Sequence, residues 1–360
     1  MLVMTFASCS VKNESFMLIV GKYNETEEKG FSLFSFNSEE GTLQHISEAE
    51  AGPNPSYFCI SKKHNLIYAA NEVMNFNGGT GGGVTCLKLD SGKVEKLSEM
   101  AVPNGSPCFI SLSPEQNYLF LANYTGGSIA VIKLDEAGMP VNITDSISFP
   151  SIAEKYSHAH MISFDPAWKH VYLTDLGLDR IVIYNFDPIS GRLTQLENGI
   201  VPLPEGSGPR HFEFNANGSK MYVICELNST ISVFDVDSAG LLSSVQNIST
   251  LDEGFAGKSF CADIHIGKSG EYLYGTNRGE NTVVCFKIGS DGLLSLAGRI
   301  SCGGDWPRNF SFDPSGKFLL TGNQRSGDIV IFSIDEKTGM PLETGKTYKV
   351  SSPSCLKFVF

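Results

Sequence analysis

The chain has 360 residues, of which 41% are hydrophobic and 18% are charged, and its formal net charge at pH 7 is −12. These values are typical of a globular protein that is long enough to bury a sizeable core. The acidic balance argues against a nucleic-acid partner, which requires a basic face, and an anionic ligand would need local positive charge. No apolar run of about 18 residues occurs, so we predict no transmembrane segment.

Residues 1–15 are predicted to be an N-terminal extension. The stretch LVMTFASCS resembles the end of a bacterial lipoprotein signal, because the small residues Ala7 and Ser8 precede Cys9. As written, it has no basic n-region, and its apolar part is too short for a signal peptide. We therefore expect a cytoplasmic protein, with a cell-envelope lipoprotein anchored at Cys9 as the alternative if the true start lies upstream.

Most of the nine cysteines lie inside apolar, strand-like runs such as YFCIS, GVTCL, YVICE and VVCFK. No CxxC pair occurs, so neither a zinc ribbon nor a thioredoxin-type motif is indicated. We predict that the cysteines are buried free thiols that behave as small hydrophobic groups, which suggests a reducing compartment.

Six segments of the chain repeat one layout of four strands and tight turns. Their second strands read LIYAANE, YLFLANY, HVYLTDL, MYVICEL, YLYGTNR and FLLTGNQ. The repeat is anchored sixteen residues before the last strand residue of each segment, which is Asn71, Asn123, Asp175, Cys225, Asn277 or Asn323. These anchors are Pro55, Pro107, Ala159, Pro209, Cys261 and Pro307. Their spacing of 46 to 52 residues is in the range of propeller blades.

The two ends of the chain supply a seventh unit. Residues 17–24, 31–37 and 43–49 have the patterns of a second, third and fourth strand without a first, and residues 353–360 have the pattern of a lone first strand. Joining these ends closes a ring, which removes exposed sheet edges. We therefore predict an all-β fold, a seven-bladed β-propeller of four-stranded antiparallel blades that forms one domain over residues 16–360.

Polar residues are predicted to converge at one rim of this ring. The first strand of a blade lines the channel and the second runs antiparallel beside it, so the start of the first and the end of the second share a rim. The residues after the anchors are Ser56, Cys108, His160, Arg210, Ala262, Arg308 and, in the closing strand, Ser354. The residues just past the second strands of the six complete repeats are Glu72, Tyr124, Leu176, Glu226, Arg278 and Gln324.

The ionisable residues are unevenly distributed around this rim, because they concentrate between about residues 158 and 310. His158, His211, Asp263 and His265 also lie near the starts of the first strands in this part of the chain. Ionisable groups that gather on one side of a channel mouth indicate a polar pocket.

Each of these groups also has a structural interpretation. Arg210 could pair with Glu226 in its own blade, which leaves substrate contact open, and His265 could be a hydrogen-bonded structural histidine. His158 and His160 alternate on one strand and could hold a metal, but no nearby carboxylate pair completes a site, so no metal is predicted.

Three rim arginines, Arg210, Arg278 and Arg308, outnumber the acids that can be assigned near them. Guanidinium groups bind carboxylate or phosphate oxygens with two parallel hydrogen bonds. The pocket is therefore predicted to bind an anion.

The segments SHAHMISFDP, GPRHFEFNANG, ELNSTISVFDV and ADIHIGKSGEYLYGTNR resemble the seven-bladed lactonase family. This family includes propeller-type 6-phosphogluconolactonase and fungal 3-carboxy-cis,cis-muconate cyclase. The resemblance covers nearly the whole chain from about residue 16 and is strongest between residues 157 and 325.

The resemblance implies an active-site set of one histidine, two arginines and one glutamate. In this chain the set falls on His160 or His158, Arg210, Glu226 and Arg278. From their position at the rim, the candidate substrate-binding residues are His158, His211, Asp263, His265 and Arg308. One departure is Asn309, which stands where the family's last-blade motif often has a glycine.

The function implied is a metal-independent lactonase without a cofactor that hydrolyses 6-phospho-D-glucono-1,5-lactone, as in the pentose phosphate pathway. Arginines would hold the anion and stabilise the developing oxyanion, and a histidine or Glu226 would deprotonate water. The alternatives are carboxymuconate lactonisation or another sugar lactone on the same site, or a non-catalytic propeller that binds a ligand or a protein. The expected partner is a small anionic lactone, and the expected state is a monomer.

Overall fold

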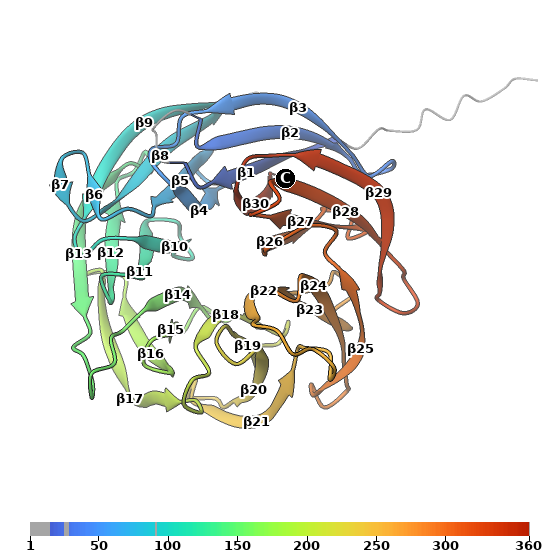
Figure 1. Cartoon of the computed structure of the whole chain (residues 1–360). Helices are drawn as coiled ribbons and strands as arrows, with labels where there is room; N and C mark the ends of the chain where they lie inside the picture. Colours follow the sequence, from blue (N-terminus) through green and yellow to red (C-terminus); the bar gives the residue numbers. More distant parts are fainter. Residues whose placement is uncertain (1–14, 25–28, 91, 360) are drawn as a thin grey trace, which may run out of the picture.

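The computed structural model describes residues 15–24, 29–90 and 92–359. These residues form 30 strands, and none of them lies in a helix. Seven four-stranded antiparallel sheets are arranged as blades around a common centre (Figure 1), and one short two-stranded hairpin is added. The predicted all-β, seven-bladed propeller is therefore confirmed. The predicted N-terminal extension with Cys9 lies outside the described residues, except for Ser15, where the first strand begins.

Blade 1 combines the first three strands of the chain with its last strand, and the strands of blades 2 to 4 follow in chain order. Blade 1 contains β1 (Ser15–Lys22), β2 (Phe31–Asn37), β3 (Thr42–Ala49) and β30 (Pro353–Val359), and blade 2 contains β4 (Pro55–Ser61), β5 (Leu66–Asn71), β8 (Gly82–Asp90) and β9 (Lys93–Val102). Blade 3 contains β10 (Pro107–Leu112), β11 (Tyr118–Asn123), β12 (Ser128–Leu134) and β13 (Pro140–Ser148), and blade 4 contains β14 (Ala159–Phe164), β15 (His170–Asp175), β16 (Arg180–Asp187) and β17 (Arg192–Pro202).

The remaining three blades repeat the same order. Blade 5 contains β18 (Pro209–Phe214), β19 (Lys220–Cys225), β20 (Thr230–Val236) and β21 (Leu242–Ser249), and blade 6 contains β22 (Phe260–Ile266), β23 (Tyr272–Arg278), β24 (Thr282–Ile288) and β25 (Leu294–Ser301). Blade 7 contains β26 (Pro307–Phe312), β27 (Phe318–Asn323), β28 (Asp328–Ile334) and β29 (Pro341–Lys349). The glycine-rich stretch after β5 forms the hairpin of β6 (Asn75–Phe76) and β7 (Gly79–Thr80).

The ring is closed by strands from the two ends of the chain. The C-terminal strand β30 is the innermost strand of blade 1 and pairs antiparallel with β1, from Met17 opposite Val359 to Lys22 opposite Pro353. This pairing satisfies edge groups that an open ring would leave exposed. The predicted seventh blade, built from both termini, is therefore confirmed.

Each innermost strand carries a β-bulge at its start. In β18, for example, Pro209 is opposite Cys225 and His211 is opposite Ile224, so Arg210 is left without a partner in the ladder. Equivalent register shifts occur at the starts of the other six innermost strands. A bulge turns a side chain away from the regular alternation, and here it redirects the residue that follows the anchor.

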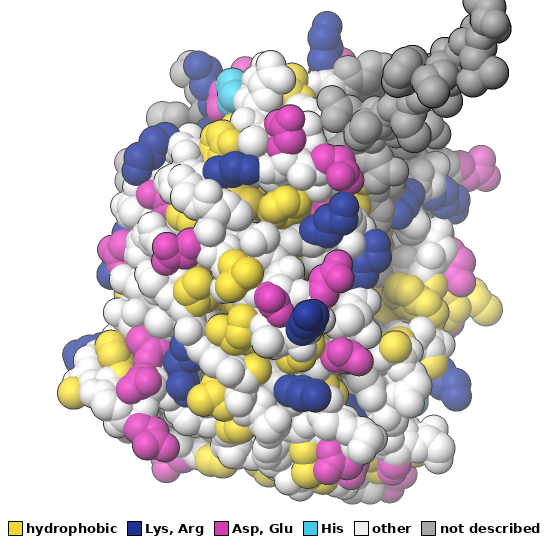
Figure 2. All heavy atoms as spheres, turned by 90° about the vertical axis from the view of Figure 1, so that its right-hand side faces the viewer, with side chains coloured by type: hydrophobic (Ala, Val, Ile, Leu, Met, Phe, Trp, Pro, Cys, Tyr) yellow, Lys and Arg dark blue, Asp and Glu magenta, His cyan; other side chains and the backbone are white. Residues whose placement is uncertain are grey.

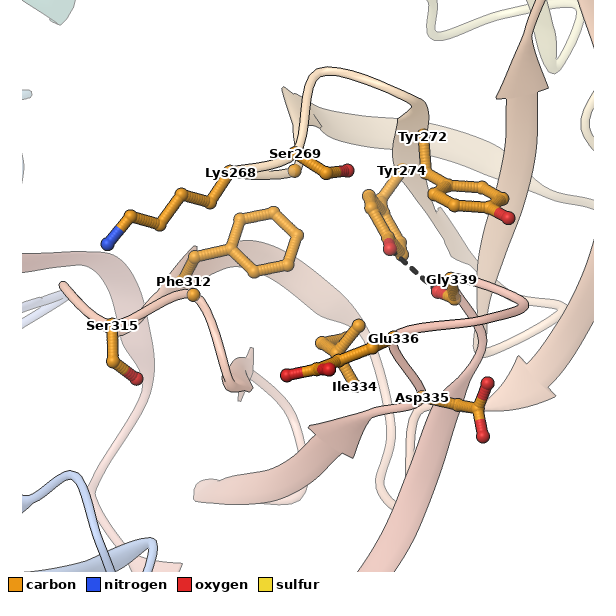
Figure 3. A pocket seen from close by; sticks show the side chains of 12 residues that line it. Lys268, Ser269, Tyr272, Tyr274, Phe312, Ser315, Ile334, Asp335, Glu336 and Gly339 are labelled. Carbon is orange, nitrogen blue, oxygen red and sulfur yellow. Dashed lines mark hydrogen bonds between the residues drawn. The ribbon is translucent and has the colours of Figure 1, made fainter.

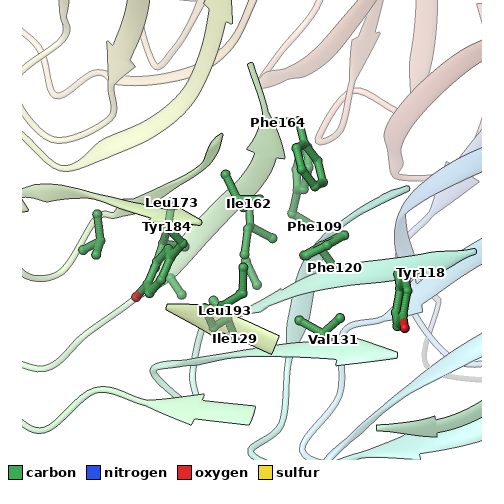
Figure 4. Packing of buried hydrophobic residues seen from close by; sticks show 14 of the residues in the cluster. Phe109, Tyr118, Phe120, Ile129, Val131, Ile162, Phe164, Leu173, Tyr184 and Leu193 are labelled. Atoms are coloured by element: carbon green, nitrogen blue, oxygen red, sulfur yellow. The ribbon is translucent and has the colours of Figure 1, made fainter. Parts of the chain in front are cut away.

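The core lies between the blades, where their apolar faces pack against one another. Figure 4 shows one such cluster between blades 3 and 4, in which Phe120, Ile162 and Phe164 interdigitate. Comparable clusters occupy the other blade interfaces. The alternating, strand-favouring residues of each second and third strand supply these faces, so the repeat pattern itself builds the core.

At several blade interfaces, a tyrosine hydroxyl of one blade donates a hydrogen bond to the next blade. Tyr274 of β23 donates to the Gly339 carbonyl in the turn between the third and fourth strands of the next blade, at 2.6 Å. The same kind of bond is made by Tyr68, Tyr118, Tyr172 and Tyr222, so five successive interfaces from blade 2 to blade 7 share it. Between blades 7 and 1 the phenyl ring of Phe318 lies against Gly41 instead, where a β-carbon would come within 2.4 Å of it.

The outer wall is mixed in character. Figure 2 shows acidic, basic and apolar side chains interspersed over the side that carries β25 and β29.

Within the described ranges, no helix is long and apolar enough to cross a membrane. Eight cysteines lie in these ranges, and all eight are buried and free, as predicted for them.

Candidate active site

A charged cavity lies at one mouth of the central channel. Its volume is about 200 Å³, and it is lined by Tyr23, Glu72, Cys108, Tyr124, His160, Arg210, Glu226, Arg278 and Arg308. Four of these residues are the bulge residues of innermost strands, and the other five stand at or just past the ends of second strands. The two registers predicted to share a rim therefore meet in one cavity.

Glu226 holds two arginines of the cavity in place. Its Oε2 atom lies 3.0 Å from Arg210 Nε and 2.8 Å from Arg278 Nη2. Burial would raise the pKa of Glu226, but the guanidinium groups of Arg278 and Arg210 outweigh it and hold this pKa below its ordinary value. Glu226 is therefore a carboxylate engaged by two cations, which makes it a weak base.

Backbone carbonyls complete the support of these two arginines. Arg210 Nη1 donates to the Ala262 carbonyl at 2.6 Å, and Arg278 Nη2 donates to the Cys261 carbonyl at 2.8 Å. Within the described part of the chain, Arg210 Nη2 and Arg278 Nη1 make no hydrogen bond. Each arginine therefore keeps an amino group for a ligand, while the rest of its guanidinium is fixed.

Arg308 is held differently, by a phenol. Its Nη2 donates to the Tyr23 hydroxyl, which in turn donates to Glu72 Oε2 at 2.5 Å. The Arg308 guanidinium lies over the Tyr23 ring at 4.8 Å, and its Nη2 is 3.9 Å from Glu72 Oε2. Burial raises the pKa of Tyr23, so the bridging phenol is neutral.

His160 is the neutral group of the cavity. Its side chain is buried, and Nδ1 has no hydrogen-bond partner among the described residues. Burial lowers the pKa of His160 well below its ordinary value, and Arg210, together with the other nearby cations, acts in the same direction. The imidazole is therefore uncharged, as a proton acceptor requires.

The cavity concentrates positive charge in an acidic protein. Three arginines and two glutamates line it, so with His160 and Tyr23 neutral the lining carries one net positive charge. The whole chain has a formal charge of −12. The lining therefore supplies the local positive charge that an anionic ligand would need.

The remaining candidate residues lie outside the cavity lining. His158 stacks on Tyr124, with ring centroids 4.5 Å apart, and its Nδ1 donates to the Tyr124 carbonyl at 3.0 Å. His211, Asp263 and His265 are joined by hydrogen bonds behind the cavity. The predicted direct substrate contact of these four residues therefore has no support from the lining, and each of them has a polar atom bonded to a neighbouring protein group.

Asn309, the departure from the family motif, is also turned away from the cavity. Its side chain donates to Asp263 Oδ2 and accepts from the Leu356 backbone N–H at 2.6 Å. The asparagine is therefore a brace between innermost strands of neighbouring blades.

The sequence reasoning missed Tyr23 as a site residue, and it left Glu72, Cys108 and Tyr124 out of the candidate set. Tyr23 follows β1, the second strand of blade 1, so it occupies the register of Glu72 and Glu226. Extending the register to the blade closed by the two termini would have found it. Burial raises the pKa of the Cys108 thiol, so this cysteine is not an activated nucleophile.

Two larger hollows lie at the opposite ends of the blades and have a different character. One, of about 340 Å³, is formed by turns of blades 6 and 7 around Tyr274, Phe312 and Gly339 (Figure 3). Its counterpart between blades 4 and 5 is lined by residues that include His170 and Gly240. Because these hollows lie at equivalent interfaces of the repeat, we attribute them to the blade architecture.

In the described ranges, no three His, Cys, Asp or Glu residues cluster in a way that could hold a metal ion.

The fold and the cavity define a seven-bladed propeller with one charged site at its axis. A family model described as a seven-bladed β-propeller lactonase matches residues 17–358. The chain belongs to this lactonase family.

Three relatives illustrate the match. The chain is 29% identical over 348 residues to a 6-phosphogluconolactonase of Bacillus subtilis, covering 94% of this chain and 97% of that protein. It is 31% identical over 355 residues to a 6-phosphogluconolactonase of Formosa agariphila, covering 94% and 98%. A periplasmic gluconolactonase of Pseudomonas aeruginosa has a similar structure, with a TM-score of 0.90 and 30% identity over 96% of this chain and 99% of that chain.

Proposed function

We propose that this protein hydrolyses 6-phospho-D-glucono-1,5-lactone to 6-phosphogluconate. The observation that carries the proposal is the neutral, buried His160, whose Nδ1 has no partner among the described residues, in a cavity that three arginines share. Membership of the lactonase family and the names of the two bacterial relatives support a lactone as the substrate.

In the proposed reaction, His160 is the general base. It takes a proton from water as the water oxygen bonds to the lactone carbonyl carbon, and the carbonyl oxygen becomes an oxyanion. The ring C–O bond then breaks, and the proton is passed to the leaving alkoxide, which becomes the hydroxyl of the open sugar acid. A positioned base of this kind contributes about 10²- to 10⁴-fold in rate.

Arg210 and Arg278 are assigned to the oxyanion. Both keep a free amino group and are fixed by Glu226 and by backbone carbonyls. Charged donors that are already oriented stabilise a developing oxyanion without reorganisation. We assign Glu226 to holding these arginines, because both of its close contacts are guanidinium groups that lower its basicity.

Arg308 is assigned to the phosphate of the substrate. It lies on the other side of the cavity, where Tyr23 and Glu72 hold it through one amino group. Guanidinium groups bind phosphate oxygens well, and a phosphate carries about two negative charges at neutral pH. An unphosphorylated sugar lactone is the second candidate, because the similar Pseudomonas aeruginosa structure is described as a gluconolactonase.

The test is a substrate panel with the purified protein. We would follow ring opening of 6-phosphogluconolactone, of gluconolactone and of carboxymuconolactone by acid release, with and without a metal chelator. The proposal expects the highest kcat/KM on the phosphorylated lactone and the same rate in chelator. A higher kcat/KM on gluconolactone would favour the second candidate, and no turnover on any lactone would favour a non-catalytic binding propeller.

A further inference from the structure

Behind the cavity, four ionisable residues form one hydrogen-bonded chain. His211 Nδ1 lies 2.7 Å from Asp263 Oδ1, His265 Nε2 lies 3.1 Å from Asp263 Oδ2, and His265 Nδ1 lies 3.0 Å from Glu213 Oε2. The side chains of His211 and Asp263 are buried, while those of His265 and Glu213 are about one third exposed. The chain therefore runs from the back of the cavity toward solvent in the channel.

Asp263 is the centre of this chain. Its two oxygens accept from His211, His265, the Asn309 amide and, at 3.4 Å, the Phe310 backbone N–H. A buried carboxylate with this many donors stays ionised, because each donor favours the charged form. The anion is neutralised by His265, since the nearby Asp263 and Glu213 outweigh the effect of burial and raise the pKa of His265 to about 10.

The other end of the chain touches the cavity at Arg210. Arg210 Nη1 lies 3.4 Å from His211 Nε2 and 3.5 Å from His211 Nδ1, and the His211 ring packs against His160 with centroids 5.1 Å apart. An ionised carboxylate can only accept, so His211 must donate its Nδ1 proton to Asp263. Nε2 is then the ring nitrogen with the lone pair, and of the two ring nitrogens it is the one slightly closer to the guanidinium.

We propose that Asp263 and His211 are positioning residues for Arg210. Asp263 fixes the tautomer of His211, His211 Nε2 accepts from Arg210 Nη1, and the free amino group of Arg210 is thereby aimed at the bound anion. His265 and Glu213 keep Asp263 charged. The inference rests on the proposed function in one respect, because it takes Arg210 to be a ligand-binding group.

The opposite tautomer explains why the aspartate is needed. With the proton on Nε2, the imidazole would present a donor to the guanidinium, and two donors would face each other. A protonated imidazole would place a second positive charge against Arg210; burial, reinforced by Arg210 itself, lowers the pKa of His211 to about 4 and disfavours this form. Only the tautomer selected by Asp263 supports the arginine.

The decisive experiment compares two variants of equal shape, His211→Gln and His211→Met. Glutamine keeps an acceptor that can meet Arg210 Nη1, and methionine removes it. We expect His211→Gln to keep most of the kcat/KM for 6-phosphogluconolactone and His211→Met to lose about 100-fold, as for a small displacement of a binding group. Equal kcat/KM in the two variants at equal thermal stability would overturn the proposal. The control is His45→Met on the outer strand β3, which should behave as wild type.

Two further measurements separate this inference from the proposed function. Nitrogen NMR of His211 should show the proton on Nδ1 in the wild type and on Nε2 in Asp263→Asn; an unchanged tautomer would overturn the role of Asp263. If the wild type turned over no lactone, calorimetry with 6-phosphogluconate as the probe would replace kinetics. His211→Met should then bind this anion about 100-fold more weakly than His211→Gln, and equal binding by the two variants would overturn the positioning role.

Discussion

The cavity has two halves that hold their arginines in different ways. In the His160 half, formed by His160, Arg210, Glu226 and Arg278 of blades 4 to 6, one carboxylate contacts two guanidinium groups at 3.0 and 2.8 Å. In the Tyr23 half, formed by Tyr23, Glu72 and Arg308 of blades 1, 2 and 7, a neutral phenol stands between the carboxylate and a single guanidinium.

In the proposed reaction, this difference separates two tasks within one cavity. Two arginines that share one carboxylate leave a surplus positive charge beside the uncharged His160, where a negative oxygen would develop. The single arginine of the Tyr23 half is balanced by its own carboxylate, and in the proposed reaction it would orient the substrate phosphate by hydrogen bonds. The variants below are chosen to affect one half without the other.

The largest effect is expected from His160→Ala. Removal of the proposed base should lower kcat on 6-phosphogluconolactone by about 10²- to 10⁴-fold. His160 Nδ1 has no partner to lose among the described residues, so a fall in the thermal unfolding midpoint should come only from the lost ring contacts with Tyr124 and His211. Steady-state kinetics with a thermal melt on the same sample checks both statements, and a variant with full activity would remove His160 from the reaction.

Glu226→Gln should uncouple the two arginines of the His160 half. We expect kcat/KM to fall by about 100-fold, because two binding groups lose their common support. Breaking a buried ion pair on one side costs about 3–5 kcal/mol, so the free energy of unfolding should fall as well. Denaturant titration measures this second effect, and wild-type stability of the variant would contradict the role assigned to Glu226.

The same glutamate makes stability depend on pH. The pKa of Glu226 is lower in the folded chain than its ordinary value of 4.5, so its contribution is present above that value and is lost as pH falls through the folded pKa. Wild-type stability should therefore drop more steeply below pH 4.5 than that of Glu226→Gln. Parallel curves for the two proteins would show that the carboxylate is not stabilised on folding.

Arg308→Gln tests the Tyr23 half. Loss of a charge-assisted hydrogen bond of about 1.5–3 kcal/mol should lower kcat/KM on the phosphorylated lactone by roughly 10- to 100-fold and leave gluconolactone nearly unaffected. Arg278→Gln is the matched control, and it should lower kcat/KM on both lactones alike. If Arg308→Gln affected the two lactones equally, the phosphate assignment would be wrong.

The smallest effect is a flat pH profile. His160 acts as a base only when it is neutral, and its pKa lies well below the ordinary 6.5 in the folded protein. The kcat/KM on gluconolactone should therefore stay constant from pH 7.5 to below pH 6.5, because the base remains unprotonated. A decline with a midpoint at or above 6.5 would show that His160 titrates normally or that another group is the base.

Much of the fold and of the cavity followed from one repeat. The anchor spacing and the turn residues predicted seven blades closed by both termini, and the two registers predicted that His160, Arg210, Arg278 and Arg308 share a rim. These predictions succeed because strand alternation and turn chemistry are local properties of the sequence.

The remaining features depend on contacts that are distant in the sequence. No local pattern shows that Asp263 accepts from His211 of the preceding blade and from Asn309 of the following blade, which removes these residues from the cavity. The same holds for His158, whose imidazole is taken up by Tyr124. The bulges that aim the rim residues also depend on pairing with the neighbouring strand. The sequence therefore predicted which residues lie at the rim, but it did not predict the bulges that orient their side chains.

The closure of the ring has a consequence for the order in which the protein becomes competent. Chains emerge from the ribosome N-terminus first, and the His160 half comes from three consecutive blades that end at Ser301. The Tyr23 half needs Tyr23 from the start of the chain and Arg308 from near its end, with β30, the last strand, sealing β1 in place. A nascent chain therefore carries the proposed base early, and the complete cavity arises only when the final strand has been synthesised and docked.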